Sequence, residues 1–124
     1  MSKADAIGIL RRDGFRCVRC GKPVAYGRDS IHHRILGNRK DNRPSNLIAL
    51  CGSGTTGCHG WVHSHPAEAR EYGWIVSRFT QRALTPDASV FYAGSGWRLL
   101  LDNFTMMPVP PPGGEDGSGE TRNT

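Results

Sequence analysis

Three segments decide how this chain folds, and they read Ile31-His-His-Arg34, Asn46-Leu-Ile-Ala-Leu-Cys51 and Cys58-His-Gly-Trp-Val-His63. They contain four of the five histidines in a sequence of 124 residues. Successive side chains of an extended strand point to opposite sides. If the first segment is a strand, His32 and His33 face different ways, so one imidazole can bind a metal ion while the other faces a substrate.

The third segment predicts a helix that carries two metal ligands. His59 and His63 are four residues apart, so they share one helical face and can bind the same ion, with His32 as a third ligand. Three protein ligands leave coordination positions open, which suits catalysis better than structural support. Pro66 interrupts this helix and leaves His65 as an alternative ligand, but the four-residue spacing favours His63 and assigns His65 to the surface.

The four cysteines predict a separate structural zinc site. Cys17-Val-Arg-Cys20 is a knuckle with two thiolates, and Cys51 and Cys58 supply the second pair. Six residues separate the second pair, which is wider than usual, but three of them are glycines and make the loop pliable. The alternatives are buried cysteines without metal or a redox pair.

The ordered His-His, Asn-Leu and Cys-His elements resemble the HNH nucleases. More narrowly, the segment from Cys51 to His63 is similar to small HNH proteins of actinobacterial phages and prophages, and the resemblance covers roughly residues 5–75. It implies an α+β chain built on a small zinc-stabilised ββα-metal domain. It also implies hydrolysis of DNA phosphodiester bonds around one catalytic divalent cation, leaving 5′ phosphate and 3′ hydroxyl ends.

The resemblance also implies individual roles for the site residues. His33 would be the general base that takes a proton from water, and Asn46 would hold the histidine loop through its amide, although an ordinary turn asparagine is the alternative. His32, His59 and His63 would hold the divalent cation. Nitrogen ligands favour manganese, nickel, cobalt or zinc over magnesium, which prefers oxygen.

Positive charge accompanies the histidine segments. Residues 1–75 hold 12 Lys or Arg against 6 Asp or Glu, as expected of a surface that meets phosphates. The polar loop after the first strand contributes Arg39, Lys40 and Arg43 as DNA-contact candidates, or else it is a solvated connection. Arg34 is a further candidate for clamping a phosphate, with a surface salt bridge as the alternative.

We predict three regions: a nuclease domain over 1–75, a C-terminal hairpin extension over 76–107 and a disordered tail over 108–124, rich in Pro, Gly and acidic residues. Hydrophobic periodicity and turn residues predict these elements: helices over 2–12, 58–65 and 66–72, and strands over 31–34, 47–50, 90–92 and 97–101.

The predicted location is the cytoplasm, that of the host if the protein is phage-encoded. No apolar run is long enough to span a membrane, and the first residues lack a signal-peptide pattern. DNA is the expected partner, with no membrane contact. The alternative function is a zinc-stabilised DNA-binding module, or a genome-packaging accessory protein that acts with phage terminase subunits.

Overall fold

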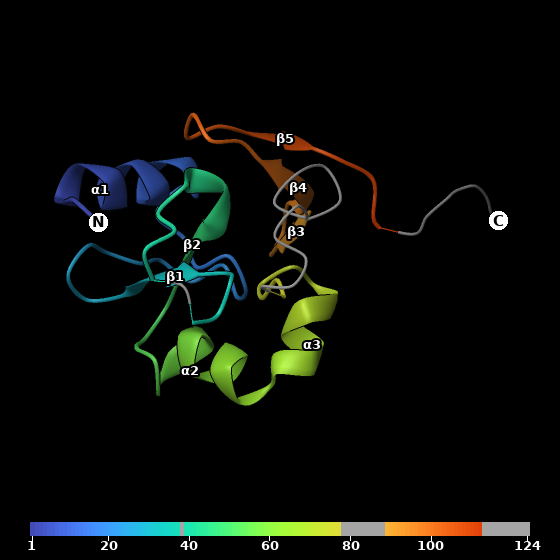
Figure 1. Cartoon of the computed structure of the whole chain (residues 1–124), viewed down its shortest axis with the longest axis horizontal. Coiled ribbons are helices and arrows are strands. Elements are labelled where there is room, and N and C mark those ends of the chain that lie inside the picture. The colour runs from blue at the N-terminus through green and yellow to red at the C-terminus, as the bar shows by residue number, and fades with distance from the viewer. Residues whose placement is uncertain (38, 78–88, 113–124) are drawn as a thin grey trace, which may run out of the picture.

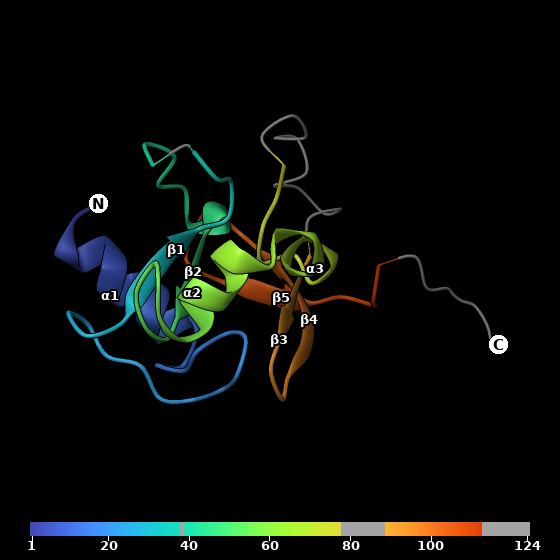
Figure 2. The same cartoon turned by 90° about the horizontal axis from the view of Figure 1, so that it is seen from below.

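The structure is a computed structural model that describes residues 1–37, 39–77 and 89–112. It is a small α+β protein with two small antiparallel sheets, one of two strands and one of three. The two-stranded hairpin lies between helices α1 and α2, and the three-stranded sheet lies beside it, next to α3 (Figures 1 and 2). Among the described residues, no helix is long and apolar enough to cross a membrane.

Helix α1 spans Lys3–Arg12 and confirms the first predicted helix. The Ser2 hydroxyl accepts a hydrogen bond from the Asp5 backbone N–H at 3.1 Å, which satisfies one of the free donors of the first turn. Buried Ile9 and Leu10 on one face pack α1 against the hairpin.

The hairpin is formed by β1, Ser30–His33, and β2, Leu47–Leu50. The register places His32 opposite Ile48 and His33 opposite Leu47. Every residue of β2 is buried, because α1 and α2 cover its two faces. The 3-10 helix η1, Pro44–Asn46, leads into β2. The bounds of β2 agree with prediction, whereas β1 begins and ends one residue earlier than expected.

Helices α2, Gly57–Ser64, and α3, Pro66–Glu71, follow the hairpin. Pro66 begins α3, where its missing N–H costs no helical hydrogen bond, and this produces the predicted break between the helices. At Gly57 the backbone φ is +60° and an added Cβ would lie 2.6 Å from the Cys51 carbonyl oxygen. Only glycine allows α2 to start this close to the end of β2.

The second sheet has three strands: β3, Val90–Tyr92, β4, Gly96–Leu100, and β5, Met106–Pro108. The first two form the predicted hairpin. The third was not predicted, and it places Pro108 in the sheet rather than at the start of the tail. Proline is tolerated there because β5 is an edge strand. Residues 113–124 of the predicted tail and 78–88 of the predicted extension lie outside the described residues.

A buried polar network joins α1 to both sheets. The Asp13 carboxylate accepts hydrogen bonds from Arg12 Nε at 2.8 Å, from the Ala49 backbone N–H at 3.0 Å and from the Tyr92 hydroxyl at 2.6 Å. The side chains of Arg12 and Asp13 are 2% and 0% exposed. Buried charge is tolerated here because each partner satisfies the other.

Candidate metal centres

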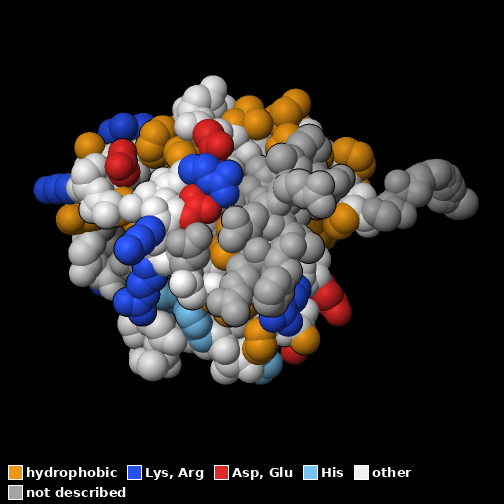
Figure 3. Space-filling model, in the orientation of Figure 1, with side chains coloured by type: hydrophobic (Ala, Val, Ile, Leu, Met, Phe, Trp, Pro, Cys, Tyr) orange, Lys and Arg blue, Asp and Glu red, His pale blue; other side chains and the backbone are white. Residues whose placement is uncertain are grey.

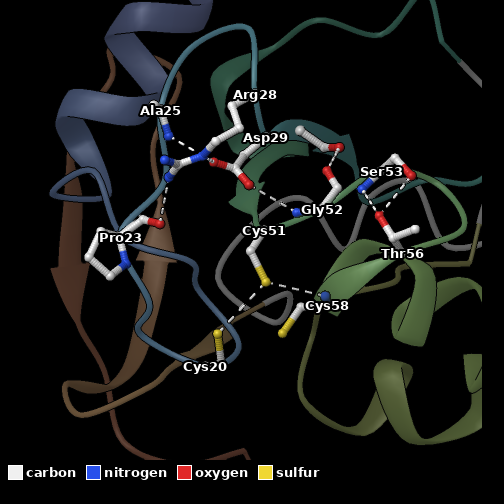
Figure 4. A network of polar contacts seen from close by, with 11 residues as sticks. Cys20, Pro23, Ala25, Arg28, Asp29, Cys51, Gly52, Ser53, Thr56 and Cys58 are labelled. Atoms are coloured by element: carbon white, nitrogen blue, oxygen red, sulfur yellow. Dashed lines mark hydrogen bonds and ion pairs between the residues drawn. The ribbon is translucent and has the colours of Figure 1, made fainter.

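The four cysteines form one compact cluster that could bind a metal ion such as zinc. Their sulfur atoms all lie within 4.8 Å of one another. Cys20 Sγ and Cys51 Sγ are 3.8 Å apart (Figure 4). Zn–S bonds of about 2.3 Å in a tetrahedron place sulfur atoms about 3.8 Å apart, so this spacing fits zinc. The four candidate ligands are Cys17, Cys20, Cys51 and Cys58.

Backbone and side-chain donors surround these sulfur atoms. The Cys58 backbone N–H points at Cys51 Sγ over 3.3 Å, and Arg19 Nη1 lies 3.3 Å from Cys58 Sγ. Burial raises the pKa of the Cys58 thiol, and Arg19 opposes this shift. The donors favour thiolates, the form in which cysteine binds a metal.

Asp29 fastens the loop that leads out of the cluster (Figure 4). Its carboxylate accepts hydrogen bonds from the Ala25 and Gly52 backbone N–H groups at 2.9 and 3.0 Å, and from Arg28 Nε at 2.8 Å. Burial raises the pKa of this carboxyl, but these donors outweigh burial and the net pKa is lowered. The segment that precedes β1 is thereby joined to the segment that follows β2, next to Cys51.

Three histidines form the second cluster. Their ligand nitrogens also lie within 4.8 Å of one another, and the three are His32, His59 and His63. The Nε2 atoms of His59 and His63 are 3.1 Å apart. Tetrahedral ligands at about 2.0–2.1 Å from an ion lie about 3.3 Å apart, so the spacing fits a shared cation. His65 is outside the cluster, with its ring stacked on Trp61 at 4.4 Å.

Hydrogen bonding orients the buried ligand of this cluster. His32 Nε2 lies 2.8 Å from the Trp74 carbonyl oxygen, which only accepts hydrogen bonds, so Nε2 carries the proton and Nδ1 keeps a lone pair for an ion. Burial and the neighbouring His59 lower the pKa of His32 to about 3. Burial and His63 lower the pKa of His59 to about 4. Both imidazoles are neutral near pH 7, as metal binding requires.

His33 follows His32 on β1, and both side chains line one cavity. Its Nε2 lies 2.8 Å from Asn42 Oδ1, an acceptor, so Nε2 donates and Nδ1 is the free basic nitrogen. The cavity has a volume of about 580 Å³. This histidine cavity is lined by His32, His33, His59 and His63 together with Arg39. Histidine and basic side chains come to the surface side by side in Figure 3.

Asn46 is fully buried behind this cavity. Its Oδ1 accepts a hydrogen bond from the Ile35 backbone N–H at 3.0 Å, and its Nδ2 donates to the Asp41 carbonyl at 2.8 Å. The amide therefore bridges the two ends of the loop that follows β1. That loop also carries Asn42, the partner of His33.

The four predicted DNA-contact residues have different environments. Arg39 lines the cavity and Lys40 is exposed. Arg43 is paired with Asp41 at 2.8 Å, but 46% of its side chain is exposed. The prediction that Arg34 contacts a phosphate is wrong, because Arg34 is only 1% exposed. Its Nε and Nη1 donate hydrogen bonds to the carbonyls of Gly73 and Ser45 at 2.8 Å. A phosphate cannot reach this guanidinium, which instead joins the segment before β2 to the segment after α3.

Sequence reasoning missed two residues at these centres. Asn42 had no signal, because a polar residue in a polar loop is typical of any solvated connection. Arg19 lies between the two cysteines of the knuckle, where a cation beside thiolates is expected, and that position was a usable signal.

Comparison with protein-family models, with curated proteins and with solved structures finds no match for this chain. Its function must therefore be argued from its own residues.

Proposed function

We propose that this protein is a metal-dependent DNA endonuclease of the HNH type, with a ββα-metal domain formed by β1, β2 and α2. The observation that carries the proposal is the arrangement around one cavity. Three imidazoles within 4.8 Å of one another supply a cation site, and His33, from the next position on the same strand, opens onto the same space.

The proton transfer is assigned to His33. Its Nε2 is committed to Asn42, so Nδ1 is the atom that would accept a proton from the attacking water. A neutral imidazole can accept a proton at one ring nitrogen while the other nitrogen keeps its hydrogen bond, and the proton is released to the solvent afterwards. The attack on phosphorus breaks the bond to the 3′ oxygen of the DNA strand. Asn42 and Asn46 act by positioning. Asn42 orients the His33 ring, and Asn46 holds the loop that carries Asn42.

A bound divalent cation would supply charge stabilisation at a phosphate oxygen and at the leaving oxygen. His32, His59 and His63 would hold it, and because they are neutral the full charge of the ion would face the substrate. Arg39, at the same cavity, and exposed Lys40 would attract the DNA backbone. The cysteine cluster would hold a structural zinc ion that is separate from the chemistry.

The experiment is cleavage of supercoiled plasmid by the wild-type protein and by His33→Ala, with Mg, Mn, Co, Ni and Zn added separately. Bound zinc is quantified in both proteins. We expect wild-type cleavage with at least one metal and a loss of about 100-fold or more in His33→Ala, because general-base catalysis contributes at least this much. His65→Ala is the matched control, since that histidine is outside the cluster. Equal cleavage by all three proteins, or no cleavage by any, would refute the proposal.

A further inference from the structure

A second cavity lies between α2, α3 and β3, and its lining includes Cys20 of the cysteine cluster. Its volume is about 430 Å³. Four aromatic side chains and two charged ones dominate its walls, namely Trp61, Tyr72, Trp74, Phe91, Arg19 and Glu68. None of its lining residues lines the histidine cavity. The proposed chemistry leaves this cavity without a role.

The aromatic rings continue one another across the wall of this cavity. Tyr72 stacks on Trp74 with ring centres 4.7 Å apart and planes inclined by 20°. Trp97 continues the row, with its ring 6.3 Å from Tyr72 and inclined by 13°. Tyr72 is 39% exposed although it is aromatic. The exposed part of the Tyr72 ring is the surface that a planar ligand can contact.

Arg19 adds positive charge beside these faces. Its guanidinium carbon lies 3.6 Å from the centre of the Trp61 ring. Within the described residues Arg19 has no carboxylate partner, and its buried Nε has no hydrogen-bond partner. Its Nη1 contacts the Cys58 sulfur, so the side chain is held in place. An arginine fixed against aromatic faces is the combination that binds single-stranded nucleic acid, through stacking and phosphate attraction.

We propose that this cavity binds an unpaired nucleotide of the DNA substrate, with its base on the aromatic faces near Tyr72. Glu68 at the wall can accept hydrogen bonds from a base amino group. The excess of basic residues over acidic ones in residues 1–75 complements a nucleic acid better than it does an average protein surface. This inference rests on the proposed nuclease function.

Helix α2 connects the two cavities. His59 and His63 lie on one face and line the histidine cavity, whereas Trp61 is two residues from each and points to the aromatic cavity. A helix with its side chains is about 10–12 Å across, so a few nucleotides can span both sites. The expected substrate therefore has single-stranded nucleotides next to the bond that is cut, as in a flap, a gap or a frayed end.

The test is equilibrium binding of full-length, zinc-loaded protein without added catalytic metal. The probes are a short fluorescein-labelled oligothymidine and a blunt duplex, both measured by anisotropy at one low salt concentration. The variant is Tyr72→Ala, Tyr72→Phe is the conservative rescue, and Tyr26→Ala is the matched control because Tyr26 is 49% exposed and outside the cavity. Circular dichroism and zinc content show that each variant is folded.

We expect Tyr72→Ala to weaken binding of oligothymidine by about 5- to 150-fold, which is the contribution of stacking one base, while duplex affinity is unchanged. Tyr72→Phe and Tyr26→Ala should bind like the wild type. Unchanged oligothymidine affinity in Tyr72→Ala, as a protein-docking cavity would give, overturns the proposal, and so does an equal loss for the duplex. Plasmid cleavage is measured separately. If the wild type cleaves plasmid but Tyr72→Ala binds oligothymidine normally, only this inference is refuted. If Tyr72→Ala weakens oligothymidine binding but the wild type cleaves nothing, only the nuclease proposal is refuted.

Discussion

Replacing Asn46 by alanine tests whether one buried amide organises the loop that carries Asn42, the hydrogen-bond partner of the proposed base. The side chain is fully buried and bridges the Ile35 backbone N–H and the Asp41 carbonyl. Alanine removes both hydrogen bonds and leaves the two backbone groups without this side-chain partner. We therefore expect lower stability and weaker cleavage in the same variant.

The magnitude follows from the burial of the two groups. The N–H of Ile35 is buried, and leaving such a donor without a partner costs about 1–3 kcal/mol. The Asp41 carbonyl is partly exposed, so losing its bond costs about 0.5–1.5 kcal/mol. The combined loss of about 2–4 kcal/mol is a large fraction of the 5–15 kcal/mol typical of a folded domain. With a urea dependence of about 2 kcal/mol per molar, in the middle of the usual range, the unfolding midpoint should fall by roughly 1–2 M.

Urea unfolding of the zinc-loaded proteins measures this change, and plasmid cleavage is assayed in parallel. Asn103→Ala is the matched control, because Asn103 is exposed and its loss should change the free energy of unfolding by less than about 0.5 kcal/mol. Asn46→Asp keeps the acceptor for Ile35 but buries a carboxylate whose second oxygen faces the Asp41 carbonyl, so at neutral pH it should be destabilised at least as much as Asn46→Ala. If Asn46→Ala unfolds at the midpoint of the control, the amide does not hold the loop and the positioning argument fails.

Two further predictions concern the cysteine cluster and the buried network. Cys20→Ser should lower the bound zinc below one ion per chain and reduce the helical circular dichroism, because a hydroxyl is a poor zinc ligand; full zinc retention would rule out Cys20 as a ligand. Burial and the nearby Asp13 raise the pKa of Tyr92 well above its ordinary value. The unfolded chain then loses this proton first, so the free energy of unfolding should fall as pH rises above about 10, and Tyr92→Phe should flatten that slope. An identical slope in the wild type and the variant would contradict this assignment.

Local sequence signals account for most of the secondary structure. Ser2 and the periodicity after it predicted α1, and Pro66 predicted where α2 gives way to α3. These features act over a few residues, through capping, turn geometry and missing backbone donors, so they can be recognised without knowledge of the fold. The spacings within the cysteine and histidine segments likewise predicted both ligand clusters, because metal geometry restricts them.

Contacts between distant segments could not be predicted in the same way. Arginine is rarely buried, so nothing near Arg34 in the sequence suggests that its partners are the carbonyls of Ser45 and Gly73, the latter 39 residues away. Strand β5 could not be predicted from the sequence either, because it is only three residues long and ends in proline. Its existence depends on the free edge of β4.

Helix α2 shows why the two ligand clusters should be energetically coupled. It has eight residues, which is too short for a stable isolated helix. Its position therefore depends on the contacts of its side chains: Cys58 in the cysteine cluster, Val62 in the core and Trp61 against Arg19. Because His59 directly follows Cys58, zinc binding that orders the start of α2 also places the first histidine of the second cluster. Zinc binding at the cysteine cluster would then contribute part of its free energy to ordering the proposed catalytic site.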